Sequence, residues 1–298
     1  MTSEGGNVLR EERLPNWMKS KLPGGPNFLK LRTMLRDSTL HTVCEEAHCP
    51  NIGECWENLS ATFMILGAIC TWRCHYCAVT TGRPDPLDPN EPRRLADTVS
   101  RLNLRYCVIT SVTRDDLDDG GAGVFAECIN KIHLEVPNCK IEVLIPDFQG
   151  DDQALSKVLA TNPDVLNHNI ETVPRIFRLV RPKGSYERSI RLLKRSKEIS
   201  PGIPTKSGMM VGLGETLDEL RKTMEELRDV GCDLLTIGQY LRPSKIHYPV
   251  KKFYHPDEFS SLKELGENLG FQFVSAGPMV RSSYQAEEQA NALKTIPI

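Results

Sequence analysis

The stretch "ATFMILGAICTWRCHYC", residues 61–77, joins a short apolar run to a loop that carries Cys70, Cys74 and Cys77. The run is too short for a helix and is bounded by a glycine, which predicts a buried β-strand. The cysteine loop follows this predicted strand directly. In parallel barrels the carboxyl ends of the strands meet at one mouth, where functional groups gather. The stretch therefore predicts a parallel barrel with a thiol-based site at its mouth.

The chain around this stretch repeats the order strand, loop and helix. Amphipathic patterns predict helices over residues 91–103, 186–199 and 216–231, and the last of these ends in a glycine, as helices often do. Strands that alternate with helices about six times indicate a parallel sheet with crossover helices. We predict an α/β fold, a partial (β/α)6 TIM-like barrel, with the seventh apolar run as a further edge strand. The predicted strands lie at residues 61–67, 105–112, 140–146, 163–170, 205–213, 233–240 and 271–276.

Two segments lie outside this repeat. We predict an N-terminal extension, residues 1–60, which contains three further cysteines, and a C-terminal extension, residues 277–298, which contains the motif "RSSY". The barrel itself spans residues 61–276. Because a chain of 298 residues is short enough to fold around one barrel, we predict a single structural domain.

Composition and charge argue against some function classes. Lys and Arg number 37 against 39 Asp and Glu, which argues against a general nucleic-acid-binding protein. No segment approaches 18 apolar residues, and the N-terminus resembles neither a signal peptide nor a transit peptide. We therefore expect no membrane span and a cytoplasmic location. In a reducing compartment, ten cysteines indicate metal or redox chemistry rather than disulfides.

Basic residues gather locally in "LRPSKIHYPVKKFY", residues 241–254. The segment sets Arg242, Lys245, Lys251 and Lys252 among aromatic side chains. Two interpretations stay open, a surface that docks a macromolecular partner and an ordinary solvated loop.

We call Cys70, Cys74 and Cys77 the second cysteine trio. Its spacing, CxxxCxxC, lacks the second pair that a structural zinc site requires. Three thiolates are also one fewer than the four that an iron-sulfur cluster normally receives from its protein. The pattern, including Tyr76 just before the last cysteine, resembles the signature of the radical S-adenosylmethionine enzymes.

This resemblance implies that the three thiolates hold three irons of a [4Fe-4S] cluster. It implies that S-adenosylmethionine chelates the fourth iron and is cleaved by an electron from the cluster to a 5'-deoxyadenosyl radical. Cofactors supply such radical chemistry, and the protein orients and shields it.

The first cysteine trio, Cys44, Cys49 and Cys55, has the spacing CxxxxCxxxxxC. This is not a common zinc spacing, and the nearby His48 offers at most a mixed site. Thiolates favour iron-sulfur chemistry, so a second cluster is our preferred hypothesis and three buried structural thiols are the alternative. The other cysteines lie in predicted strands or helices and are interpreted as small buried hydrophobic residues: Cys107, Cys128, Cys139 and Cys232.

Both trios together, with "LPNWMKSKLPGGPNF" (residues 14–28), "LNHNIETV" (166–173) and "RSSY" (281–284), resemble the lipoyl synthase family over most of the chain. The resemblance implies that Ser283 is the fourth ligand of an auxiliary [4Fe-4S] cluster and is catalytic in that role. From the residues alone, "RSSY" could also start a helix, with a serine N-cap ahead of Glu287.

The activity implied by this resemblance is sulfur insertion. Two sulfur atoms enter a protein-bound octanoyl group at C6 and C8, and two molecules of S-adenosylmethionine are used for each lipoyl group. The auxiliary cluster is the sulfur donor and is consumed, so it must be rebuilt after each round.

Glycine-rich turns after two predicted strands are candidate cofactor contacts, although each could be an ordinary turn. By resemblance, the first turn lies near the methionine part of S-adenosylmethionine, and the segment "NIE" (residues 169–171) lies near its ribose. The predicted cofactor-binding residues are Tyr76, Gly120, Gly121, Asn169, Glu171, Gly212 and Gly214.

The resemblance also implies partners. These are octanoylated lipoyl carrier domains of 2-oxoacid dehydrogenase E2 subunits and of the glycine cleavage H protein, an electron donor such as ferredoxin or flavodoxin, and an iron-sulfur carrier for cluster repair. A methylthiotransferase acting on tRNA would require a more basic chain with an RNA-binding appendage, and biotin synthase lacks the first cysteine trio. A non-catalytic metal-binding or electron-transfer protein would not need a large barrel. We expect neither nucleic acid nor a membrane as a partner.

Overall fold

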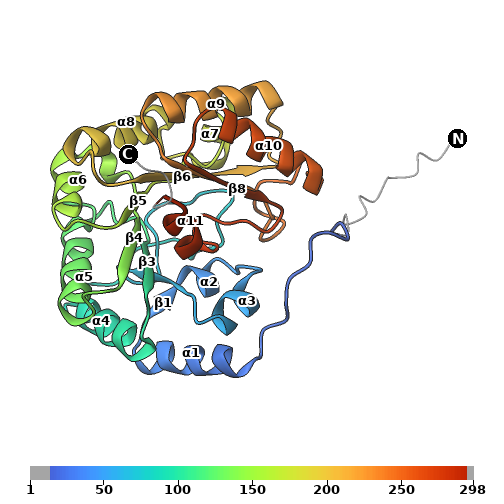
Figure 1. Cartoon of the computed structure of the whole chain (residues 1–298). Coiled ribbons are helices and arrows are strands. Elements are labelled where there is room, and N and C mark those ends of the chain that lie inside the picture. Colours follow the sequence, from blue (N-terminus) through green and yellow to red (C-terminus); the bar gives the residue numbers. More distant parts are fainter. Residues whose placement is uncertain (1–13, 294–298) are drawn as a thin grey trace, which may run out of the picture.

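The computed structural model describes residues 14–293, which form one sheet of eight strands (Figure 1). The strands follow one another in chain order across the sheet. Seven strands run parallel, and the first pairs antiparallel with the second. The strands are β1 (His41–Thr42), β2 (Thr62–Ile65), β3 (Tyr106–Ser111), β4 (Lys140–Leu144), β5 (Val165–Asn167), β6 (Thr205–Val211), β7 (Leu234–Gln239) and β8 (Phe273–Gly277).

The predicted incomplete barrel is confirmed. The six clear strand predictions correspond to β2 to β7, and the run predicted as a further edge strand forms β8. The antiparallel strand β1 was not predicted, because two residues show no periodicity. Within residues 14–293 no pairing joins β1 to β8, so the sheet has two edges and the barrel stays open.

Helices cover the outer face of the strands and form an arc around them (Figure 1). They are α4 (Glu91–Leu102), α5 (Ala122–Glu135), α6 (Asp152–Leu159), α7 (Pro174–Val180), α8 (Tyr186–Ile199), α9 (Leu217–Asp229) and α10 (Pro256–Asn268), with a short 3-10 turn η1 (Phe148–Gly150) before α6. The three predicted helices match α4, α8 and α9. A capping box at Thr216 and Glu219 begins α9, and Gly231, with φ of +81°, follows its end as predicted.

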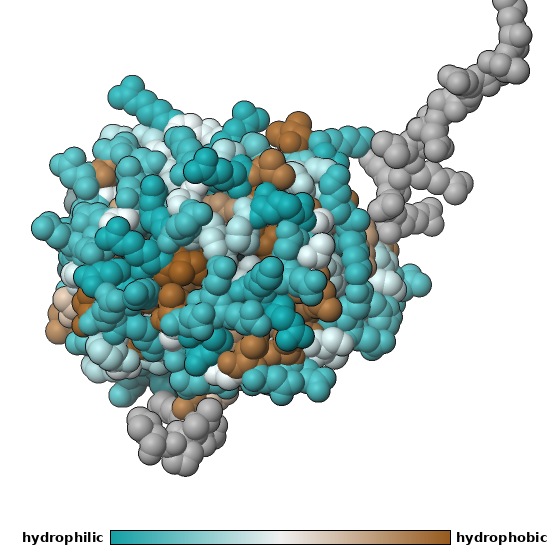
Figure 2. Space-filling view, turned by 90° about the horizontal axis from the view of Figure 1, so that it is seen from above, coloured by the Kyte–Doolittle hydropathy of each residue, from teal (hydrophilic) through white to brown (hydrophobic). Residues whose placement is uncertain are grey.

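The hydrophobic core lies between the strands and this arc of helices. On α4, Leu95 and Val99 are fully buried, whereas Arg93 and Arg101 on its other face are exposed. Burying such a leucine or valine stabilises the fold by about 1.5–3 kcal/mol. Figure 2 looks onto the side where α8, α9 and α10 lie, and it shows a mostly hydrophilic surface with scattered hydrophobic residues. The amphipathic patterns in the sequence therefore correspond to helices with one face on the sheet and one in solvent.

Four helices belong to the two extensions: α1 (Pro26–Asp37), α2 (Val43–Glu46), α3 (Ile52–Glu57) and α11 (Ala286–Ala292). Helix α2 packs against β1 and β2, α3 packs against α1, and α11 packs against β3 and β8. Asn51 Nδ2 donates a hydrogen bond to Met279 O at 2.6 Å, and Tyr284 Oη donates to Glu54 Oε1 at 3.3 Å. The two ends of the chain are therefore joined to each other on the open side of the barrel.

The alternative interpretation of "RSSY" as a helix start is wrong. Helix α11 begins at Ala286 after Gln285, which has φ of +51° and whose side chain makes no capping bond. Neither serine therefore caps this helix, and both remain available to a site.

Predictions for residues 1–13 and 294–298, including the reading of the N-terminus, lie outside the described residues. Within residues 14–293, no helix is both long and apolar enough to cross a membrane. The division into two extensions and a barrel within one domain stays a prediction.

Candidate active site

A cavity of about 520 Å³ lies inside the barrel, a volume typical of small-molecule sites. Its wall is built from the sheet and from both extensions. Five of the six cysteines in the two trios line it, together with the serines of "RSSY", whereas Cys55 is not part of the lining. These lining residues are Cys44, Cys49, Cys70, Cys74, Cys77, Ser282 and Ser283. The cysteine trios and the "RSSY" motif, which lie far apart in the sequence, therefore line one cavity.

The loop that carries the second cysteine trio leaves β2 through a left-handed turn. Leu66 and Gly67 have φ of +69° and +85°. The buried Glu91 of α4 accepts a hydrogen bond from Leu66 N at 2.8 Å, and the buried Arg114 donates from Nη1 to Leu66 O at 3.1 Å. These two side chains fix the point where the loop leaves the sheet. Sequence reasoning missed both, because their role depends on packing against a distant turn.

The thiols of the second cysteine trio lie in an environment that disfavours their charge. Burial raises the pKa of Cys74 to about 12, against the opposing effect of the Arg181 guanidinium, and burial raises the pKa of Cys77 to about 11. Repulsion among the three sulfurs adds to both shifts. All three thiols are free. Thiolates here require cationic neutralisation, which the irons of an iron-sulfur cluster supply.

The first cysteine trio is spread over two short helices of the N-terminal extension. Cys44 lies on α2, Cys55 on α3, and Cys49 between them. Burial raises the pKa of Cys44 to about 11, with the charge of Cys49 adding to the shift. Burial also raises the pKa of Cys55 to about 12, with Cys44 and Cys49 adding. The three sulfurs are therefore near enough to act on one another, and they too require a cation as thiolates.

Ser283 reaches the same cavity from the other end of the chain. Thr62 Oγ1, at the start of β2, donates a hydrogen bond to Ser283 Oγ at 2.7 Å. A hydrogen bond donated to an oxygen favours its deprotonated form, so Thr62 favours the alkoxide that a metal would bind. Thr62 was not predicted, because no pattern links the first residue of a strand to a C-terminal motif.

Three of the predicted cofactor contacts line the cavity. These are Tyr76, Asn169 and Glu171. Burial raises the pKa of Glu171, while Arg181 and hydrogen bonds from Tyr76 and Asn169 oppose the shift. The buried Asn169 Oδ1 has no hydrogen-bond partner, which suits a ligand that donates a hydrogen bond. A side chain at Gly208 would place its Cβ 2.7 Å from this oxygen, so the glycine keeps the space open.

The four predicted glycines do not line this cavity. Gly120 lines a separate cavity of about 320 Å³ beside it, and a Cβ at Gly121 would contact the side chain of Leu66. Gly212 and Gly214 belong to the lining of neither cavity. Cofactor contact at these four positions stays a prediction.

Gly212 has a packing reason of its own. Its φ is +100°, and a Cβ there would lie 2.5 Å from Lys252 O. Glu215 accepts hydrogen bonds from Gly212 N at 2.6 Å and from Leu213 N at 2.9 Å. The backbone N–H groups of Gly212 and Leu213 are therefore already hydrogen-bonded within the protein.

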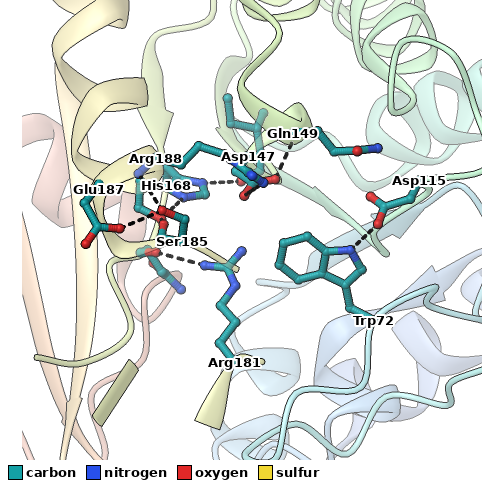
Figure 3. Close-up of polar contacts among 12 residues, drawn as sticks. Trp72, Asp115, Asp147, Gln149, His168, Arg181, Ser185, Glu187 and Arg188 are labelled. Carbon is teal, nitrogen blue, oxygen red and sulfur yellow. Dashed lines mark hydrogen bonds and ion pairs between the residues drawn. The ribbon is translucent and has the colours of Figure 1, made fainter. Parts of the chain in front are cut away.

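A positive side chain, Arg181, lies beside Trp72, which stands between the first two cysteines of the second trio (Figure 3). The buried Arg181 places its guanidinium 5.2 Å from the ring centroid of Trp72, and Trp72 Nε1 donates to Asp115 Oδ2 at 2.5 Å. Among residues 14–293, no carboxylate lies within ion-pair distance of Arg181 and its Nε has no hydrogen-bond partner, although Glu171 lies close enough for the two charges to interact. The cavity wall therefore offers a cation that an anionic group of a bound ligand could neutralise.

The cysteines outside the two trios are buried, as predicted: Cys107, Cys128, Cys139 and Cys232. Among residues 14–293, no three His, Cys, Asp or Glu side chains converge on a single metal ion. In a [4Fe-4S] cluster each thiolate binds its own iron, so the ligands do not have to converge. The clustered free thiols fit such a cluster as a donor set.

Comparison with known families agrees with this geometry. Residues 64–227 match the model of the radical SAM superfamily. Residues 4–49 match the model of the N-terminal domain of lipoyl synthase of the radical SAM family. The two matches cover the second and most of the first cysteine trio.

Similar folds occur in solved structures. Methylornithine synthase has a TM-score of 0.54 and 15% identity, with 75% of this chain and 73% of that chain covered. SuiB of Streptococcus suis, bound to S-adenosylmethionine, has a TM-score of 0.57 and 10% identity, with 76% of this chain and 53% of that chain covered. At such low identity these structures establish the fold alone.

Similarity in sequence is much higher to several lipoyl synthases. The lipoyl synthase of Rubrobacter xylanophilus is 55% identical over 285 residues, covering 94% of this chain and 89% of that protein. The lipoyl synthase of Koribacter versatilis is 54% identical over 280 residues, covering 94% and 92%. That of Nitrosococcus oceani is 54% identical over 284 residues, covering 95% and 88%. The chain therefore belongs to the lipoyl synthase family of the radical SAM superfamily.

Proposed function

We propose that this protein is a lipoyl synthase, a sulfurtransferase that inserts sulfur at C6 and C8 of an octanoyl group on a lipoyl carrier domain. One observation carries the proposal: thiols of both cysteine trios and Ser283 line a single cavity. A reaction that joins sulfur to an unactivated carbon needs a radical source and a sulfur source beside the same substrate. The family membership supports the same activity.

The family implies a [4Fe-4S] cluster and S-adenosylmethionine. We assign this cluster to the second cysteine trio. We assign an auxiliary [4Fe-4S] cluster to the first cysteine trio with Ser283 as its fourth ligand. When bound, these groups supply a 5'-deoxyadenosyl radical, from two molecules of S-adenosylmethionine per lipoyl group, and the sulfur.

Side chains of the cavity bind and orient the two small reactants. Tyr76, Asn169 and Glu171 hold S-adenosylmethionine beside the second cysteine trio, and Arg181 offers a charge for its carboxylate. The apolar octanoyl chain needs an apolar wall, which Met64 and other apolar lining residues provide. Apolar lining also excludes water from a reactive radical.

Thr62 and Ser283 form a hydrogen-bonded pair that determines how strongly Ser283 binds the auxiliary cluster. The hydroxyl of Thr62 stabilises the oxygen of Ser283 as a metal ligand through a 2.7 Å hydrogen bond. Oxygen is a harder ligand than thiolate and is less suited to an iron-sulfur cluster. One replaceable ligand suits a cluster that gives up sulfur.

The segment of residues 241–254 is our candidate docking surface for the carrier domain. Tyr248 N donates to His75 O at 2.7 Å, and His247 Nε2 lies 3.0 Å from Cys77 O, so the segment packs against the loop of the second cysteine trio. Arg242 lines the cavity, and Lys251 is exposed. Lys252 instead pairs with Glu258 at 2.5 Å.

Several partners complete the proposal. The carriers are 2-oxoacid dehydrogenase E2 subunits and the glycine cleavage H protein. A ferredoxin or flavodoxin supplies electrons, and an iron-sulfur carrier rebuilds the auxiliary cluster. The ten cysteines, with no disulfide among the described residues, support a reducing cytoplasm as the location.

Anaerobic reconstitution followed by a single turnover with an octanoyl-lysyl peptide tests the proposal. We expect about eight irons per chain, because each of two clusters holds four. We also expect 5'-deoxyadenosine and a monothiolated peptide intermediate attached to the protein. Replacement of a buried cysteine outside both trios, Cys139→Ala, serves as the matched control and should keep all three results. Four irons with no cleavage of S-adenosylmethionine would contradict the proposal.

A further inference from the structure

Arg281 is a cavity residue to which the proposed function has not yet given a role. It follows β8 and lies two positions before Ser283 on the lining of the large cavity. Gly238 of β7 makes this placement possible, because a Cβ there would collide with Val280 O and lie 3.2 Å from Arg281 Nη1. The close approach of β7 and the C-terminal extension therefore brings a guanidinium into the cavity.

The charge of Arg281 has no anionic partner in the described protein. Its Nη1 donates to the neighbouring Val280 O at 2.6 Å. In residues 14–293, no carboxylate lies within ion-pair distance of Arg281, whereas Arg114 pairs with Asp116 and Arg188 with Asp147. The other N–H groups of this guanidinium remain available, and an arginine cannot lose its charge.

Cys44 and Cys49 line the same cavity as Arg281, and Ser283 lies two positions further along the chain on that lining. Cys49 belongs to the first cysteine trio. A cluster held by thiolates carries net negative charge, and its reduction potential depends on nearby charge and on hydrogen bonds to its sulfurs. Arg281 therefore stands where such a cluster would need a counter-charge and N–H donors.

We propose that Arg281 is the counter-charge of the auxiliary cluster and donates hydrogen bonds to its sulfurs. This inference rests on the proposed function, which assigns that cluster to the first cysteine trio. In this role Arg281 raises the reduction potential of the auxiliary cluster and holds the cluster more firmly. The alternative is a structural role, in which Arg281 only secures the backbone at Val280.

The apoprotein separates these two roles. A structural arginine would stabilise the fold with or without a cluster. A counter-charge without its anion does not stabilise the apoprotein, because a partly desolvated cation is unfavourable. Arg281→Met, which keeps length and removes charge, should therefore leave the Tm of the apoprotein unchanged or higher and should lower the Tm of the reconstituted protein.

The reduction potential gives a second measurement. In protein whose second cysteine trio is replaced by alanine, only the auxiliary cluster binds, and its potential can be titrated by EPR. We expect Arg281→Met to make reduction about tenfold less favourable, which corresponds to about 59 mV for one electron. Arg281→Lys should restore most of the shift, because it keeps the charge. Arg181→Met, on the cavity wall beside the other trio, is the matched control and should shift this potential less.

Three outcomes would overturn the inference: an unchanged potential in Arg281→Met, equal behaviour of the Met and Lys variants, or a lower Tm of the Arg281→Met apoprotein. Loss of the cluster from Arg281→Met alone, with the Tm of the apoprotein kept, would support it. If the parent protein with an intact first cysteine trio binds no iron, the proposed function fails instead. The two failures are therefore distinguishable.

Discussion

The second cysteine trio lies on one loop that leaves β2, whereas the first is divided between α2 and α3 of the N-terminal extension. Glu91 and Arg114, both within the barrel, hold the exit of the second trio's loop. Cys44, Cys49 and Ser283 line one cavity, and contacts such as Asn51 with Met279 join the two chain ends beside it. The comparison teaches that the second trio is held by contacts within the barrel, whereas the first trio lies at a junction of the two ends of the chain.

Ser283→Ala should produce the largest difference between the two sites. We expect sulfur insertion to fall by about a hundredfold, because the proposed auxiliary cluster would lose a ligand, while formation of 5'-deoxyadenosine stays within about twofold. Product analysis by mass spectrometry and chromatography measures both. Ser282→Ala, from the adjacent lining position, is the matched control. Equal loss in both variants, or full activity in Ser283→Ala, would refute the special role of Ser283.

Thr62→Val should act in the same direction with a smaller effect. Valine keeps the shape of threonine but cannot donate to Ser283 Oγ, so Ser283 would be a weaker ligand of the proposed auxiliary cluster. We expect about tenfold slower sulfur insertion and faster loss of iron from the auxiliary site on chelation. Thr110→Val, which removes a hydrogen bond to Leu144 O from another lining residue, is the control. Identical iron loss in the two variants would show that the Thr62 bond does not matter.

Lys251→Glu tests whether the carrier approaches on the side of the second cysteine trio. Reversing this exposed charge should raise the KM for an octanoylated carrier about fivefold at low salt, and the difference should shrink as salt screens it. Turnover of a short octanoyl-lysyl peptide should not change. Lys263→Glu on the outer helix α10 is the control. A KM for the carrier that is unchanged at low salt would leave residues 241–254 as an ordinary solvated loop.

The smallest expected effect concerns stability on the wall of the second trio. Burial lowers the pKa of His168 to about 4, while its Nδ1 bonds Ile145 O at 2.8 Å. Between pH 6.5 and pH 4, His168 binds a proton in the unfolded chain but not in the folded chain. The free energy of unfolding therefore falls as the pH falls from 6.5 toward 4. His168→Gln should reduce this dependence, which thermal unfolding across that range measures. An equally steep fall in the variant would assign the acid sensitivity to other groups.

The barrel was largely predictable because its strands are continuous apolar runs and its helices are amphipathic. Their signals are local, and the capped helix α9 illustrates this at Thr216 and Gly231. The short strand β1 and the helix start after Gln285 were not predictable, since neither has a period or a usual capping residue.

The site was predictable only in part. Cysteine spacing marked both trios, and the family resemblance supplied Ser283. Thr62, Arg181 and Arg281 were missed, because each acquires its place from contacts across the barrel. The glycine-rich turns are ambiguous: Gly212 supports a left-handed turn packed on Lys252 O, and no sequence pattern separates that use from cofactor contact, which stays a prediction.

The most direct test replaces the whole first cysteine trio with alanine and measures iron, 5'-deoxyadenosine and inserted sulfur in one reconstituted sample. Two separate sites predict about four irons per chain, retained cleavage of S-adenosylmethionine and no sulfur insertion. Sulfur insertion at the level of the unchanged protein, or loss of S-adenosylmethionine cleavage together with all iron, would contradict the assignment of the two trios to two different tasks.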